Sequence, residues 1–76
     1  MKRYIKEMAN DIQRDIQKEI DSLKIPFGEL AELGKSVNTI IRLTECGCMT
    51  NLGAVRGLTE TWEKLAELKY EGREKS

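Results

Sequence analysis

The sequence contains no histidine, a single proline, and only four aromatic residues: one tryptophan, two tyrosines and one phenylalanine. Histidine is the usual general base of enzymes and the commonest metal ligand, so its absence removes the simplest route to both chemistries. Carboxylates are plentiful, but none stands in an apolar surrounding that would raise its pKa for acid–base work. We therefore expect no catalytic residue and no enzyme activity.

Cysteine is almost as scarce, and both copies, Cys46 and Cys48, flank Gly47. A closed zinc site needs four ligands, which one chain with two cysteines and no histidine cannot supply, although two such turns in a dimer could. We expect no metal and no cofactor. The favoured interpretation is a pair of small buried side chains at a helix end. Metal binding between chains and an intermolecular disulfide are the alternatives.

No charge of one sign prevails, because thirteen basic residues balance thirteen acidic ones. A domain that grips nucleic acid through its phosphates usually carries a basic excess, so nucleic acid is not the expected partner. No apolar run is long enough to span a membrane. Lys2 and Arg3 are followed by Glu7 and Asp11 without the apolar core of a signal peptide. We expect a cytoplasmic protein with reduced thiols.

The sequence does contain helical periodicity, which is clearest in its middle third. Leu30, Leu33, Val37 and Ile40 alternate spacings of three and four, with Thr44 next in step, which keeps one helix face apolar. Phe27, Ala31 and Ile41 widen this stripe. The flanking segments carry far more charge. The pattern predicts a helix over residues 26–45 that lies at the centre of a bundle.

A first helix is predicted over residues 4–23, whose apolar positions recur close to the straight-helix period of about 3.6. These positions are Ile5, Met8, Ala9, Ile12, Ile16, Ile20 and Leu23. The polar side carries an acidic row made of Glu7, Asp11, Asp15 and Glu19. We expect ion pairs from Asp11 to Arg14 and from Asp15 to Lys18. The row is interpreted as a solvated face, with a docking strip for a basic partner as the alternative.

A third helix is predicted over residues 51–70, and residues 71–76 are expected to fray because they include no apolar side chain. Its stripe is Leu52, Val55, Leu58, Trp62 and Leu65. Gly53 and Gly57 share one face, which favours close helix packing. Pro26 and Gly47 mark the two connections, and Thr50 or Asn51 can cap the last helix.

These elements predict an all-α fold with residues 1–76 as a single domain, either a three-helix bundle or a helical hairpin assembly. A chain this short buries roughly 60% of its surface on folding, and its hydrophobic content is only 39%. Self-association would compensate, so we expect a homo-oligomer, with a monomeric bundle as the alternative. The residues assigned to the core or the oligomer interface are Leu30, Leu33, Val37, Ile40, Leu58 and Trp62.

The segment 30–43 carries Leu30, Ala31, Gly34, Ser36, Thr39 and Ile40. In these residues it resembles the helix-turn-helix of the Cro/repressor family. The resemblance implies a DNA-binding regulator with a turn near Gly34 and a recognition helix that offers Ser36, Asn38, Thr39 and Arg42 to a groove. The first helix of that pair would be one residue short, and the neutral charge would supply few phosphate contacts. A continuous helix is the favoured prediction.

A polar cluster is the remaining candidate site. Arg42 and Arg56 are the only cations between Lys35 and Lys64. With Asn38 and Thr39 they could bind a small anionic ligand such as a nucleotide, because guanidinium groups offer paired donors. The competing interpretation pairs Arg42 with Glu45 or Glu63.

Three functions follow from these observations. The first is a non-enzymatic protein-interaction module that uses the surfaces of the first and third helices: an adaptor, regulator or inhibitor of the kind that phages and mobile elements often encode. The second is an oligomeric scavenger of a small anionic ligand. The third is the DNA-binding regulator.

Overall fold

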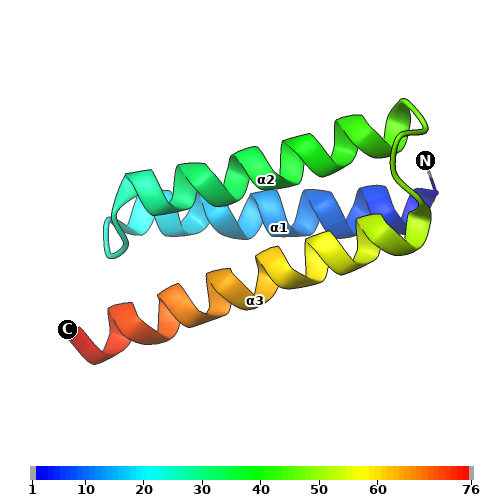
Figure 1. Ribbon diagram of the computed structural model, residues 1–76. Helices are drawn as coiled ribbons and strands as arrows, with labels where there is room; N and C mark the ends of the chain where they lie inside the picture. The colour runs from blue at the N-terminus through cyan, green and yellow to red at the C-terminus, as the bar shows by residue number, and fades with distance from the viewer. Residues whose placement is uncertain (1, 76) are drawn as a thin grey trace.

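The computed structural model describes residues 2–75, with side chains described for residues 2–71, and this part of the chain is entirely helical apart from its connections. The helices are α1 (Arg3–Ser22), α2 (Phe27–Glu45) and α3 (Asn51–Lys75). Figure 1 shows α1 and α2 running antiparallel side by side, with α3 returning along them. Each helix packs against the other two. The prediction of an all-α fold is confirmed, and the molecule measures 42 × 17 × 17 Å.

The core is built from aliphatic side chains alone. Its buried residues are Ile5, Ala9, Ile12, Ile16, Ile25, Leu30, Leu33, Val37, Ile40, Ala54, Leu58 and Leu65. The stripe assigned to α2 therefore lies inside, and Thr44 continues it, since its hydroxyl donates to the Ile40 carbonyl at 2.7 Å. Ile25 in the α1–α2 connection is also buried, although its place before Pro26 gave no sign of this.

The buried line of α3 differs from the predicted one. Leu52 is 67% exposed and Trp62 is 41% exposed, so the assignment of Trp62 to the core is wrong within the single chain. Thr61 takes the inward position instead, on a line with Ala54, Leu58 and Leu65. Its hydroxyl donates to the Gly57 carbonyl at 2.9 Å, which satisfies the buried oxygen. Phe27 is also exposed rather than part of the α2 stripe.

Gly57 allows α2 and α3 to come close. A Cβ at this position would lie 2.7 Å from Cδ1 of Ile40, so a side chain there would displace the isoleucine. Gly53 has a different neighbourhood, because a Cβ there would meet only Thr50 and Met49 in the preceding turn. The prediction of close helix packing is therefore confirmed at Gly57 but not at Gly53.

The connections on either side of α2 have the residues predicted for helix ends, whereas α3 ends later than predicted. Pro26 is the N-cap of α2, one residue before its first turn, and Thr50 accepts the backbone N–H of Gly53 at 3.0 Å. Gly47 has φ +81, the left-handed conformation that follows many helices. α3 continues to Lys75, beyond the predicted end at residue 70, because Glu, Arg and Lys are good helix formers and no proline intervenes. Ser76 lies outside the described residues.

The resemblance to a helix-turn-helix does not extend to the backbone. α2 runs unbroken through Gly34 from Phe27 to Glu45, so the turn that would separate the two helices of that motif is not formed. In the described part of the chain, none of the three helices has the length and apolar character needed to cross a bilayer.

Candidate functional site

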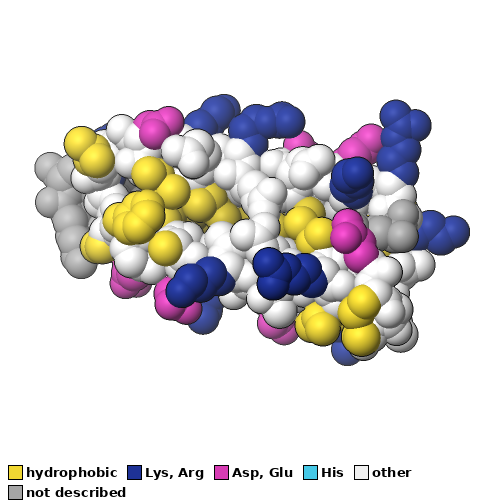
Figure 2. Space-filling model, turned by 90° about the horizontal axis from the view of Figure 1, so that it is seen from above, with side chains coloured by type: hydrophobic (Ala, Val, Ile, Leu, Met, Phe, Trp, Pro, Cys, Tyr) yellow, Lys and Arg dark blue, Asp and Glu magenta, His cyan; other side chains and the backbone are white. Residues whose placement is uncertain are grey.

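All four aromatic side chains lie on the surface. Tyr4, Phe27 and Tyr70 are each more than half exposed, and Trp62 is the most covered of the four. Figure 2 shows hydrophobic side chains gathered on one face, most densely toward the end of the bundle that holds the α1–α2 connection. Tryptophan and tyrosine are the residues that most often dominate binding energy at protein interfaces. In this protein all four aromatic side chains lie outside the buried core, which is aliphatic apart from two threonines.

Two of these aromatics share a groove between α1 and α3. The groove has a volume of about 510 Å³, and its lining consists of Tyr4, Glu7, Met8, Asp11, Thr59, Trp62 and Glu63. α1 contributes residues one turn apart, and α3 contributes Thr59, Trp62 and Glu63. The result is an apolar floor with two aromatic rings and a rim of carboxylates.

The carboxylates of the α1–α3 groove are only weakly neutralised. Glu7 accepts from Arg3 at 3.3 Å and Asp11 lies 3.7 Å from Arg14, but all four side chains are largely exposed. Exposed pairs of this kind contribute at most about 1 kcal/mol and exchange readily with other partners. Glu63 has no ion pair among the described side chains. Glu63 is therefore the rim carboxylate without a neutralising partner among the described side chains.

The rest of the acidic row of α1 is engaged within the molecule. Lys69 of α3 donates to Asp15 at 2.6 Å and lies 4.0 Å from Glu19, with all three side chains less than a third exposed. The expected pair between Asp15 and Lys18 is thus replaced by a contact across the bundle. The predicted row divides into a structural half and a half that borders the groove.

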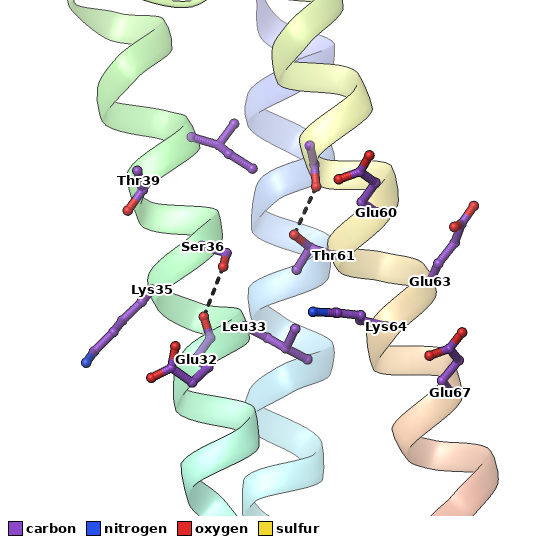
Figure 3. Close-up of a pocket in the computed structure, with 12 residues that line it drawn as sticks. Glu32, Leu33, Lys35, Ser36, Thr39, Glu60, Thr61, Glu63, Lys64 and Glu67 are labelled. Carbon is purple, nitrogen blue, oxygen red and sulfur yellow. Dashed lines mark hydrogen bonds between the residues drawn. The ribbon is translucent and has the colours of Figure 1, made fainter.

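A second groove runs between α2 and α3 and is larger, about 750 Å³. Its charged lining is Glu32, Lys35, Glu60, Glu63, Lys64 and Glu67. Figure 3 shows Lys64 reaching across from α3 while Lys35 points away from it. The hydroxyl of Ser36 donates to the Glu32 carbonyl, so it is already paired. Four carboxylates against two ammonium groups make this groove unsuited to an anion.

Of the four residues predicted to bind an anionic ligand, only Thr39 lines either of the two grooves. Asn38 accepts from Gln13 of α1 at 2.6 Å, whereas Thr39 lines the α2–α3 groove. Arg42 and Arg56 are exposed, and neither makes an ion pair with any described side chain, including Glu45 and Glu63.

Tyr4, Met8 and Thr59 line the α1–α3 groove but were not identified from the sequence. Tyr4 is the first residue of the predicted helix 4–23, Met8 belongs to its apolar stripe, and no motif surrounds Thr59. The one available signal was the presence of an aromatic residue on each of two different helices, which becomes a site only once the register between α1 and α3 is known.

The cysteine pair contradicts the favoured interpretation. Cys46 and Cys48 are both exposed, so they do not pack against the core. Cys46 follows the last residue of α2 and lies in a tight turn whose peptide groups bond back to the helix. Among the described residues, no cluster of three or more potential ligands could hold a metal ion.

Comparison of the chain with protein-family models, with curated proteins and with solved structures gave no match in any of the three.

Proposed function

We propose that this chain is a non-enzymatic protein-interaction module that holds a basic segment of a partner protein in the α1–α3 groove. The observation that carries the proposal is the separation of side chains: aliphatic residues fill the core, while every aromatic residue lies on the surface. Aromatics contribute more to burial than any other side chain, so a small domain that exposes all of them sacrifices stability for binding.

The chemistry of the α1–α3 groove favours a basic occupant. Tyr4 and Trp62 offer aromatic faces, and Glu7, Asp11 and Glu63 place carboxylates around them. An arginine guanidinium stacks on aromatic rings and donates paired hydrogen bonds to carboxylates, so it fits both parts of this lining. Weak pairing of Glu7 and Asp11 with their own arginines lets a partner's cation replace those contacts at little cost.

Self-association belongs to the same proposal and uses a different surface. Leu23, Phe27 and Tyr70 are exposed toward the end of the bundle where α1 finishes and α2 begins. Apolar side chains at one end favour contact between copies of the chain, which leaves the α1–α3 groove open in each copy.

A capture experiment with matched variants tests the proposal. The tagged chain is incubated with a lysate of the cells that encode it, and retained proteins are quantified by mass spectrometry. We expect Trp62→Ser and Glu63→Lys to lower recovery of the specific partner about tenfold or more, because hot-spot side chains carry at least about 2 kcal/mol.

Phe27→Ser is the control, since it removes an exposed aromatic outside the groove and should keep the partner. Circular dichroism confirms that each variant is folded, and light scattering after gel filtration reports its assembly state. Equal recovery of the same proteins by the wild-type chain and by both groove variants would reject the α1–α3 groove as the binding site.

A further inference from the structure

The turn between α2 and α3 holds two exposed thiols in contact. Sγ of Cys46 lies 2.8 Å from Sγ of Cys48. This separation is well inside ordinary contact between two sulfur atoms, and it exceeds the covalent S–S length of about 2.05 Å by less than ~1 Å. Both cysteines are free and exposed, so a reagent in solution can reach either sulfur.

The backbone fixes this arrangement. The N–H groups of Cys48 and Met49 both donate to the Leu43 carbonyl, at 2.8 and 3.0 Å, and the N–H of Cys46 donates to Arg42 at 3.0 Å. Gly47 has φ +81, a conformation that other residues rarely adopt, and it turns the chain so that its two neighbours face each other. These contacts hold the backbone of the turn in the conformation that places the two cysteines side by side.

We propose that Cys46 and Cys48 form a thiol–disulfide exchange site, in which Cys46 attacks a low-molecular-weight disulfide and Cys48 resolves the product. The Cys46 thiolate attacks one sulfur of R–S–S–R, the S–S bond breaks, and RS⁻ leaves. Cys48 loses its proton to water and attacks Sγ of Cys46, which expels the second RS⁻. Two protein thiols are oxidised, one small disulfide is reduced, and the two protons end on the released thiols.

The electrostatics of the pair agree with this order. The hydrogen bond from the Cys48 thiol, followed by the Cys48 backbone N–H, lowers the pKa of Cys46 below the ordinary value. The same hydrogen bond, followed by the charge on Cys46, raises the pKa of Cys48. The first proton lost by the pair therefore comes mainly from Cys46, and the thiolate is the reacting form.

Ellman's disulfide reagent tests the proposal on the intact chain, because each attack releases one coloured thiolate. The wild-type chain should release two per chain and finish without an adduct, with an intramolecular disulfide seen by mass spectrometry. Release of the second thiolate should not depend on reagent concentration, since it comes from attack within the turn. Cys48→Ser should release one thiolate and keep the adduct.

The double variant Cys46→Ser/Cys48→Ser is the blank, and circular dichroism reports whether the helices persist in every form. Dithiothreitol should restore both thiols of the oxidised wild-type chain. A wild-type product that carries two stable adducts, or one that is linked to a second chain, would overturn the proposal.

Discussion

At the scale of the residue, glycine lowers the stability of a helix at Gly34 and allows two helices to pack closely at Gly57. Gly34 lies inside α2 with nothing within 4 Å of the point where a Cβ would be, so its cost is purely the lowered helix propensity. Gly57 lies inside α3 against Ile40, where the absence of a side chain lets the two helices approach. Both glycines lie inside a helix, and the contact with the facing helix distinguishes Gly57 from Gly34.

We predict that Gly34→Ala raises the free energy of unfolding by about 0.5–1 kcal/mol, the propensity difference between glycine and alanine. Gly57→Ala should raise the free energy of unfolding by less than this, or should lower it. The new Cβ would lie 2.7 Å from Cδ1 of Ile40, which must move, and overpacking typically costs about 1–3 kcal/mol. Urea unfolding of both variants measures the difference. Equal gains would show that α2 and α3 are not in contact at Gly57.

The residues at the helix ends could be predicted from the sequence, because their conformations depend on residues that are close along the chain. Thr50 caps α3, Gly47 takes the left-handed conformation after α2, and Pro26 stands at the start of α2. The link from Lys69 to Asp15 could not be predicted, because the residues lie 54 positions apart and many other carboxylates were available. Long-range pairing depends on the register between helices.

At the scale of the element, α2 does not hold the predicted place at the centre of the bundle, because each of the three helices packs against the other two. The prediction of its buried face is nevertheless correct. Val37 is completely buried, whereas its neighbour Ser36 is exposed. The stripe at alternating spacings of three and four predicted this face, and each of its four residues is buried.

We predict that Val37→Asp prevents folding, because an unpaired buried charge costs about 3–5 kcal/mol, comparable with the whole stability of a small domain. Ser36→Asp places the same side chain one position away in solvent and should change stability by about 0.5 kcal/mol or less. Circular dichroism with urea titration compares them. A cooperative unfolding transition in Val37→Asp would contradict the position of α2.

The buried face of α3 was predicted less accurately than that of α2, for a physical reason. Leu58 and Leu65 fix two inward positions, but either Thr61 or Trp62 can lie between them on a helix. Hydrophobicity favours tryptophan, whereas the structure places Thr61 inward, one turn after the close contact between Gly57 and Ile40. Thr61 fits because its hydroxyl is satisfied by its own helix. Sequence patterning alone thus placed the tryptophan inside and missed the groove that it lines.

Across the whole molecule, aliphatic and aromatic side chains occupy different places. Aliphatic residues hold three helices together, and Tyr4 and Trp62 with part of the acidic row of α1 line the groove that we propose receives a basic partner. The neutral net charge of the chain conceals this arrangement, because the carboxylates around Trp62 are concentrated in one groove. Local charge, and not the total, determines which ion approaches that ring.

The most direct test is quenching of the fluorescence of Trp62, the only tryptophan in the chain. Acrylamide should quench it strongly, and caesium should quench better than iodide when each is compared with free tryptophan, because the carboxylates of the groove attract cations. High salt should reduce the difference between quenching by caesium and quenching by iodide, and so should the substitution Glu63→Gln. Resistance to all three quenchers would place Trp62 in the core, and preferential quenching by iodide would show a rim of the opposite charge; either result would contradict the account.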